Sequence, residues 1–243
     1  YLLEEAFSGA GCLLLPLPLT RDGKTLNAPF SPCPPLLSHL EEQIPQGLPL
    51  VGGGLSRPFF KERRGVTVDL LSEEDFALQN ALPSADGALG LALLHHAGVL
   101  FGSNCAIFGY GRIAEALLCR LLALGARVTV FARRQESLLK AEAAGARALP
   151  FSALSDHLPA FDLLFNTVPA PVLSPELCAL LGEEALYLEL ASPPFGVCES
   201  GRQVLGKRLL MAGGLPGKYA PLYGGALIAR RVLALLKGES LPK

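Results

Sequence analysis

The sequence contains no tryptophan, one methionine and only four histidines among its 243 residues. Charged residues make up 18% of the chain, and 21 basic side chains balance 22 acidic ones. A chain with so little excess charge has no electrostatic footprint for nucleic acid or for an anionic membrane surface. Half of the residues are apolar, which excludes a disordered chain and provides material for a buried core. The composition therefore favours a small-molecule site.

The six cysteines are scattered and form no Cys-x-x-Cys pair. Zinc sites need clustered thiolates or imidazoles, and the histidines do not supply such a cluster either. We therefore expect no metal site. Cysteines inside apolar runs are expected to behave as small buried hydrophobes, which fits a reducing compartment such as the cytoplasm.

The longest uncharged stretch, residues 87–111, is long enough on paper to cross a bilayer. It contains two adjacent histidines and several glycines, which interrupt its helical character. A buried helix followed by a buried strand explains this stretch better, so we expect no membrane span.

Residues 1–83 are predicted to form a small α/β domain on the substrate side. Short strands are expected over 13–15, 48–51 and 66–69, separated by proline-rich turns. The first residue is tyrosine and not methionine, so this domain is expected to lack its first strand. Apolar spacing then predicts a connecting helix over 84–98, with Ser84 as its N-cap.

Residues 84–218, which include that connecting helix, are predicted to form a dinucleotide-binding domain. Strands are expected over 104–108, 127–131, 146–149, 161–165, 185–190 and 208–212, and helices over 111–124, 135–144, 174–181 and 197–205. Such alternation implies a parallel sheet with right-handed crossovers. The predicted fold class is α/β: a Rossmann-type doubly wound parallel sheet plus a smaller flavodoxin-like N-terminal domain. Residues 219–243 are expected to fold back onto that N-terminal domain through a last helix.

The strand expected over 104–108 runs into the sequence G-x-G-x-x-A, with an amphipathic helix after it. Gly109 permits the tight turn, Gly111 lets a pyrophosphate approach the backbone, and Ala114 lets helix and strand pack closely. The helix N-terminus would hold the pyrophosphate, since its N–H groups and dipole favour anions. The predicted cofactor contacts in this turn are Gly109, Tyr110, Gly111, Arg112 and Ile113.

The end of the next strand discriminates between dinucleotides. NAD sites usually place an acidic residue there for the ribose hydroxyls, but no acid occurs over residues 126–135. The strand ends instead in Ala132, Arg133 and Arg134, and guanidinium groups suit a 2′-phosphate. The pattern favours NADP over NAD, and surface arginines without a ligand remain the alternative.

Three further loops are expected beyond the carboxyl ends of the strands, where such sheets place their ligands. The first loop contributes four predicted cofactor contacts near the nicotinamide: Asn166, Thr167, Val168 and Pro169. The second loop follows Leu190 and contains Ser192, and the third covers residues 213–219.

These segments together resemble the family of the A subunit of dipicolinate synthase, over most of the chain. The segment Asn80-Ala-Leu-Pro-Ser-Ala-Asp86-Gly-Ala is similar to that family's Asn-Ala-x-Pro-Thr-Ala-Glu-Gly-Ala. Phe108-Gly-Tyr-Gly-Arg-Ile is similar to its dinucleotide turn. Its later signatures resemble Asn166-Thr-Val-Pro169, Leu190-Ala-Ser192 and Gly214-Leu-Pro-Gly217, the last followed by Ala220-Pro221.

The resemblance implies a subunit that forms dipicolinate (pyridine-2,6-dicarboxylate) from a dihydro- or hydroxytetrahydro-dipicolinate precursor, with NADP⁺ as hydride acceptor. It implies a partner, the B subunit of dipicolinate synthase, which resembles flavin-binding decarboxylases. It also implies a homo-oligomer in the cytoplasm of the mother cell of a spore-forming bacterium.

A dicarboxylate substrate requires cationic or hydroxyl groups beside the nicotinamide. The candidates are Ser192, Lys218 and Tyr219 from the cofactor side, and Arg57 from a glycine-rich loop of the first domain. Arg57 or Lys218 is expected to bind one carboxylate. No residue is assigned as a catalytic acid or base.

Three alternatives remain open. A D-2-hydroxyacid-dehydrogenase-like enzyme shares the two-domain architecture but needs a late histidine, and none follows His157. A shikimate-dehydrogenase-like enzyme needs a Lys–Asp pair in the first domain, which the spacing does not recommend. A non-catalytic NADP-binding subunit would need no acid–base pair at all.

Overall fold

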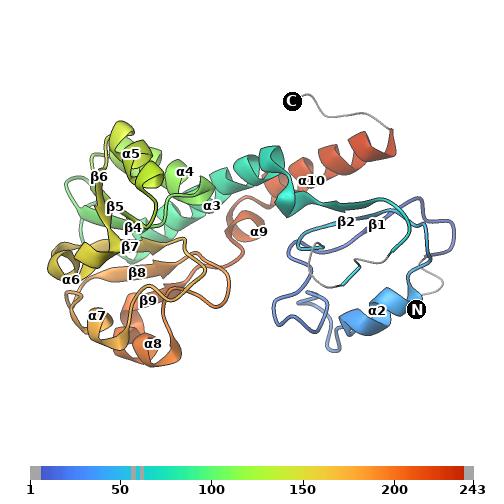
Figure 1. The fold of residues 1–243 in the computed structure, drawn as a ribbon, viewed down its shortest axis with the longest axis horizontal. Coiled ribbons are helices and arrows are strands. Elements are labelled where there is room, and N and C mark those ends of the chain that lie inside the picture. The colour runs from blue at the N-terminus through green and yellow to red at the C-terminus, as the bar shows by residue number, and fades with distance from the viewer. Residues whose placement is uncertain (1–6, 56–58, 61–62, 238–243) are drawn as a thin grey trace. The chain divides into compact units, whose positions relative to one another are not determined.

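The computed structural model describes residues 7–55, 59–60 and 63–237 (Figure 1). Its contacts group into two compact units, of which the central unit comprises residues 80–225. The terminal unit comprises the described residues on either side of the central one. Two helices, α3 (Glu74–His95) and α10 (Pro221–Leu236), carry the chain from one unit to the other.

The central unit is built on one six-stranded sheet in which every pair of neighbouring strands is parallel. The strand order is β6-β5-β4-β7-β8-β9. The strands are β4 (Asn104–Phe108), β5 (Arg127–Ala132), β6 (Arg147–Pro150), β7 (Leu163–Asn166), β8 (Leu186–Glu189) and β9 (Leu209–Met211). The chain moves outward in one direction from β4 to β6 and then restarts on the other side of β4, so the topological switch point lies between β4 and β7. This order confirms the predicted α/β class with a Rossmann-type sheet.

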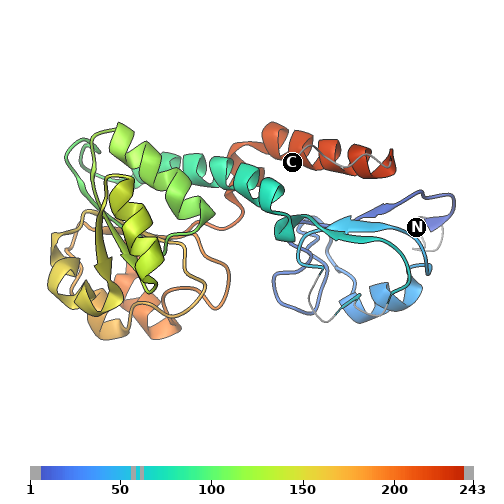
Figure 2. The same ribbon diagram turned by 45° about the horizontal axis from the view of Figure 1, so that its top comes forward.

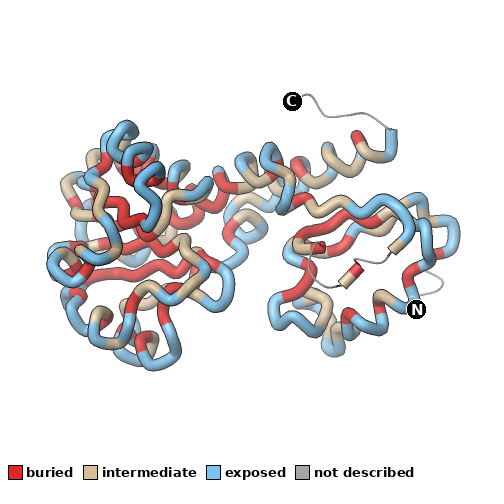
Figure 3. Tube along the Cα trace, in the orientation of Figure 1, coloured by how far each residue is buried: buried red, intermediate tan, exposed pale blue. Residues whose placement is uncertain are grey.

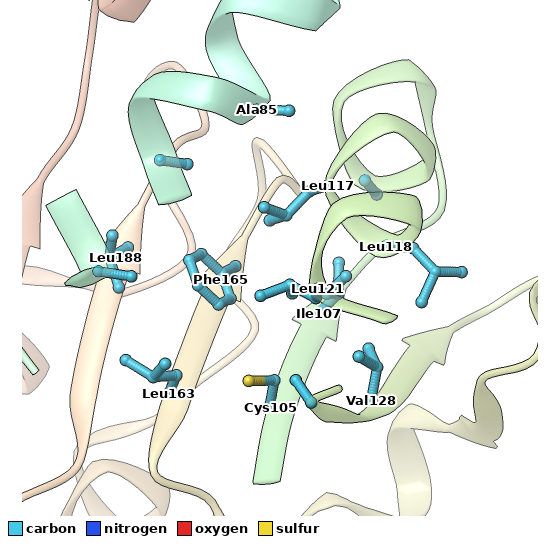
Figure 4. Packing of buried hydrophobic residues seen from close by; sticks show 14 of the residues in the cluster. Ala85, Cys105, Ile107, Leu117, Leu118, Leu121, Val128, Leu163, Phe165 and Leu188 are labelled. Atoms are coloured by element: carbon cyan, nitrogen blue, oxygen red, sulfur yellow. The ribbon is translucent and has the colours of Figure 1, made fainter. Parts of the chain in front are cut away.

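Helices cover both faces of this sheet because its buried strands alternate their side chains between two cores (Figures 2 and 3). Cys105 and Ile107 of β4 belong to the core under α3 and α4 (Arg112–Ala123), which Figure 4 shows. Ala106 and Phe108 point into the opposite core, which α6 (Leu154–His157), α7 (Pro175–Ala179) and α8 (Glu199–Leu205) help to cover. The remaining helices of this unit are α5 (Gln135–Ala143), α9 (Leu215–Tyr219) and the 3₁₀ turns η2 (Phe151–Ala153), η3 (Leu158–Ala160) and η4 (Gly206–Arg208).

The terminal unit has a three-stranded parallel sheet in the order β1-β2-β3. Its elements before α3 are β1 (Leu13–Leu14), α2 (Leu37–Gln43), β2 (Leu50–Gly52), β3 (Thr67–Asp69) and the 3₁₀ turn η1 (Leu70–Ser72). Adjacent residues of β2 face different cores: Leu50 packs with residues of α2, whereas Val51 packs with Phe76 of α3 and Leu227 of α10. The second core of this small unit therefore needs a helix from the far end of the chain.

The connecting helix differs from the expectation at its start. It begins at Glu74 and not at Ser84, and it contains Pro83 in its interior. Ser84 resembles an N-cap and a proline inside a helix is costly, so the sequence favours a helix that starts after Pro83. In the structure the Ser84 hydroxyl donates to the Asn80 carbonyl at 3.0 Å, which places a polar contact in the turn that proline interrupts. Three further α-helices, α2, α6 and α9, were not predicted from the sequence, and α9 contains Pro216 in its first turn.

No helix among the described residues is long and apolar enough to cross a membrane. In the same part of the chain, no three histidine, cysteine, aspartate or glutamate side chains gather into a group that could hold a metal ion.

Candidate dinucleotide site

The glycine turn after β4 lies at the carboxyl edge of the sheet, beside the switch point. Gly109 has a φ of +88°, and its N–H donates to the Phe131 carbonyl of β5 at 2.8 Å. A Cβ at this position would lie 2.8 Å from both Thr167 Oγ1 and Val168 Cγ2. Glycine is thus required twice, by the left-handed backbone and by the close approach of the loop after β7.

Gly111, by contrast, borders open space. It is the N-cap of α4, and a Cβ built on it would meet no atom within 4 Å. No side chain caps the helix at this position, since glycine has none. A helix N-terminus that is exposed and lacks a side-chain cap fits a pyrophosphate, because its backbone N–H groups and its dipole both favour an anion. Ala114 is fully buried between α4 and the sheet, as the close-packing position of this turn requires.

Two other residues of the turn point in different directions. Tyr110 is half-buried against the core, and its hydroxyl lies 3.4 Å from the Lys140 carbonyl at the end of α5. Burial raises its pKa, with smaller contributions from Glu115 and Cys119. Arg112 is exposed and Ile113 is partly buried, both in the first turn of α4.

The end of β5 presents two guanidinium groups to solvent. Ala132 is buried and pairs with Pro150 of β6, and the exposed Arg133 and Arg134 follow it directly. Within the described residues Arg133 makes no ion pair or side-chain hydrogen bond, whereas Arg134 contributes to lowering the pKa of Glu136. Arg133 is therefore the cation better placed to bind an anionic ligand.

Asn166 occupies a different environment from the one expected. It is fully buried, and its amide donates to Glu189 Oε1 at 2.6 Å and to the Val168 carbonyl at 3.0 Å. Its Oδ1 accepts the Val168 N–H at 3.1 Å. Because these atoms are engaged within the protein, Asn166 holds the loop in place and does not offer its side chain to a ligand. This corrects the expectation that Asn166 contacts the nicotinamide.

The other three residues of that loop remain at the surface of the site. Thr167 and Val168 are partly buried and Pro169 is exposed. The Thr167 hydroxyl donates to the Phe108 carbonyl at 2.7 Å, which fixes the loop to the end of β4.

Glu189, the last residue of β8, was not predicted from the sequence. Its exposed fraction is 1%, and it is the one charged side chain in the buried set of the described residues. Burial raises the pKa of this carboxyl, while hydrogen bonds from Asn166, Gly196, Ala191 and Tyr187 act in the opposite direction. A single acid inside the apolar run from Leu186 to Leu190 was the signal that could have found it, since an isolated charge in a buried strand needs partners.

The predicted substrate ligands are distributed over two of the loops. Ser192 is exposed after β8, and Lys218 is exposed in α9. Tyr219 is 46% exposed, but its ring lies where a Cβ on Gly87 of α3 would meet it at 3.0 Å, so part of the ring packs on that helix. Arg57 lies outside the described residues.

Comparisons with known proteins agree with this geometry. Residues 99–196 match a family described as "Putative NAD(P)-binding". The matched segment contains the glycine turn, the end of β5 and the loop after β7. It supports a nicotinamide dinucleotide as cofactor without separating NADP from NAD.

A curated protein, the A subunit of dipicolinate synthase of Bacillus subtilis (strain 168), is 31% identical over 169 residues. The chain is a relative of this A subunit. The aligned region covers 70% of this chain and 57% of the Bacillus subtilis protein, so the chain spans little more than half the length of that relative. The resemblance predicted from the sequence is thus confirmed.

Solved structures of the same kind of subunit share the fold. The A subunit of dipicolinate synthase from Bacillus halodurans gives a TM-score of 0.82 at 26% identity, covering 97% of this chain and 81% of that one. The Bacillus subtilis structure gives 0.79 at 26% identity, covering 96% and 81%. A transhydrogenase from Sinorhizobium meliloti, at 14% identity and a TM-score of 0.64 over 82% and 71% of the two chains, shares the fold alone.

Proposed function

We propose that this protein is an NADP-dependent oxidoreductase subunit that forms dipicolinate from a dihydro- or hydroxytetrahydro-dipicolinate precursor. One observation carries the cofactor part of the proposal: the open, uncapped N-terminus of α4 lies next to a strand that ends in two exposed arginines and no acid. The resemblance to the A subunit of dipicolinate synthase supports the substrate part.

The preference for NADP follows from charge. A 2′-phosphate at the end of β5 would meet Arg133, whose guanidinium has no competing carboxylate among the described residues. An NAD site would place there an acid that accepts hydrogen bonds from the ribose. Such an acid would also repel the 2′-phosphate, and the segment contains none.

Titration calorimetry with NADPH and NADH tests this preference. We expect NADPH to bind at least about tenfold more tightly, and Arg133→Ala to remove most of the difference. Arg127→Ala is the matched control, because Arg127 is exposed at the opposite end of the same strand. Tighter binding of NADH by the unaltered protein would contradict the proposal.

In the proposed reaction the protein binds and orients a dianion beside the cofactor. The hydroxytetrahydro precursor first loses water, and oxidation of the dihydropyridine then removes a hydride and a proton to give the aromatic ring. NADP⁺, when bound, would supply the hydride acceptor. Lys218 would bind one carboxylate and Ser192 would donate to the other, while Arg57 of the N-terminal segment remains a further candidate for the first role.

The substrate assignment is tested by steady-state kinetics. We expect Lys218→Ala to raise KM for the precursor about tenfold with a smaller change in kcat, because the ammonium binds a carboxylate that does not react. Lys207→Ala serves as the control, since Lys207 is exposed in η4 at the entry to β9. Equal KM values for both variants would remove Lys218 from the site.

A non-catalytic NADP-binding subunit is the second candidate. It is favoured by the burial of Glu189, which is engaged by four donors and cannot reach a substrate as a general base.

The proposal further includes the flavoprotein-like B subunit of dipicolinate synthase as partner, a homo-oligomeric state, and the cytoplasm of the mother cell of a spore-forming bacterium as location. Incubating the protein with NADP⁺ and precursor, with and without the B subunit, separates the candidates: product formation by the protein alone excludes the non-catalytic one.

A further inference from the structure

Glu189 lies where the loops after β7 and β8 meet. Its Oε1 accepts from Asn166 Nδ2 at 2.6 Å and from the Ala191 N–H at 3.1 Å. Its Oε2 accepts from the Gly196 N–H at 2.8 Å and from the Tyr187 hydroxyl at 3.5 Å. Each carboxyl oxygen thus faces two donors, and such an arrangement favours the ionised form against the cost of burial.

These contacts join two segments that are far apart in the sequence. Asn166 ends β7, whereas Ala191 and Gly196 bracket the loop that carries Ser192. The backbone extends the same connection, because the Gly196 carbonyl accepts the N–H groups of Val172 and Leu173 at 2.8 and 3.0 Å. The Leu190 N–H also donates to the Asn166 carbonyl at 2.9 Å. The two loops therefore form one hydrogen-bonded layer with the Glu189 carboxylate at its centre.

Packing at Gly196 requires a glycine in this arrangement. A Cβ on Gly196 would come within 2.7 Å of the Tyr187 hydroxyl and would collide with Asn166 Nδ2. The loop between Ala191 and Gly196 is held at its other side as well, where the Arg202 guanidinium lies 4.6 Å from the centre of the Phe195 ring. A buried charge is costly unless every partner is present, so burying it here secures one arrangement of the loop.

We propose that Glu189 is a positioning residue, which holds the loops after β7 and β8 in the arrangement that receives the nicotinamide half of the cofactor. The inference rests on the proposed function. In sheets of this type the two halves bind the two parts of a dinucleotide, so the β4–β6 half would bind the adenosine part and the β7–β9 half the nicotinamide part. The carboxylate acts through Asn166 and through the backbone around Ser192, and it does not touch the cofactor.

The test compares two ligands that differ only in the nicotinamide part: NADPH and 2′-phospho-ADP-ribose. Glu189→Gln keeps the shape of the side chain but turns an amide NH₂ toward two of the four donors. We expect it to weaken NADPH binding by about tenfold and to change 2′-phospho-ADP-ribose binding by less than about twofold. The matched control is Glu184→Gln, the same change at an exposed residue just before β8, and it should leave both affinities unchanged. Glu189→Asp, which restores the charge, should recover part of the NADPH affinity.

Equal weakening of both ligands, or no weakening of either, would overturn the inference, because a general loss of structure does not distinguish the two halves of the cofactor. Failure of the proposed function has a different signature: the unaltered protein would bind neither ligand, and the inference would fall with it. If circular dichroism shows Glu189→Gln to be unfolded, Asn166→Ser carries the same comparison. That change removes one donor and leaves the carboxylate with three. It should again weaken NADPH binding more than 2′-phospho-ADP-ribose binding, but by a smaller factor than Glu189→Gln.

Discussion

The two units of this chain are both parallel α/β structures, but they reach stability in different ways. The central unit has strands of three to six residues, and helices close a separate core on each face of its sheet. The terminal unit has strands of two or three residues and two small cores, one of which includes residues of α10. The central unit is assembled from one continuous stretch of chain, whereas the terminal unit needs contributions from both ends.

The difference shows how proline content limits a sheet. Between Pro16 and Pro35 the chain contains six prolines, and each removes a backbone donor that a longer strand would use. Polar turns replace part of the lost pairing: the Asp22 carboxylate accepts from the N–H groups of Lys24 and Thr25 at 2.8 Å each, and these bonds lower its pKa. Substitutions in each unit can test this difference.

The largest expected effect comes from removing a core leucine in each unit. Leu118 is fully buried under the central sheet, and Leu227 is 6% exposed in the second core of the terminal unit. Replacing either with alanine should cost about 2–5 kcal/mol of unfolding free energy, through lost burial and the cavity left behind. Hydrogen exchange measured by mass spectrometry should show each loss confined to its own unit. If both units lost protection together with either change, they would unfold as one cooperative body.

The two glycines of the turn should separate stability from binding. Gly109→Ala forces a left-handed backbone and a clash with Thr167 and Val168, so it should destabilise the central unit by about 1–3 kcal/mol. Gly111→Ala meets open space at an ordinary φ of −105°, and it should leave the thermal midpoint unchanged while weakening NADPH binding. Thermal melts measure the stability of both variants, and titration calorimetry measures their affinity for NADPH. A Gly111→Ala protein with normal affinity would contradict the assignment of the pyrophosphate to the N-terminus of α4.

The ion pair between Arg231 and Glu73 should contribute less to the unfolding free energy than a core leucine does, and only to that of the terminal unit. The guanidinium donates to both carboxyl oxygens, and the two side chains are 17% and 28% exposed. Arg231→Ala should lower the unfolding free energy by about 1 kcal/mol, more than an ordinary surface pair, because the geometry is bidentate and partly buried. The neighbouring exposed residue gives the control, Arg230→Ala, which should have no measurable effect in the same denaturant titration. A double-mutant cycle with Glu73→Gln isolates the pair.

The smallest effect is expected at Lys140 and Glu136 of α5. Their side chains are 64% and 68% exposed, and Lys140 Nζ lies 2.7 Å from Glu136 Oε1. Lys140→Ala should not move the thermal midpoint of the central unit beyond measurement error, since solvent screens such a pair. A clearly lower thermal midpoint would mean that exposed ion pairs contribute measurably to the stability of the central unit.

Much of the central unit could be predicted because each local signal agreed with the next. The apolar run of β4, the glycines at 109 and 111, and the amphipathic spacing of α4 all indicated one βαβ unit, and the structure contains it. Elements whose packing partners are distant in the sequence were harder to predict from local patterns. The sequence favours a helix start after Pro83, whereas the helix runs through that proline and buries Ala85 and Ala88 within the central unit.

The candidate site divides along the same line. The conformation of the glycine turn agrees with its sequence: Gly109 is left-handed and Gly111 caps α4 in open space, because the glycine spacing has a direct conformational meaning. The contacts of this turn with a cofactor stay a prediction. Asn166 was placed in the correct loop but given the wrong partner, and Glu189 was missed. Both errors concern a buried hydrogen bond across 23 positions of the sequence, which no local pattern specifies.

The order of residues alone predicted a parallel sheet with a glycine turn after its first strand and an adjacent pair of arginines, because backbone freedom, apolar spacing and charge are local properties. Only the tertiary structure decided which polar side chains of these loops lie at the surface and which support the loops from within. A carboxylate can remain buried only where several donors converge on it, and that convergence exists once β7 and β8 lie side by side.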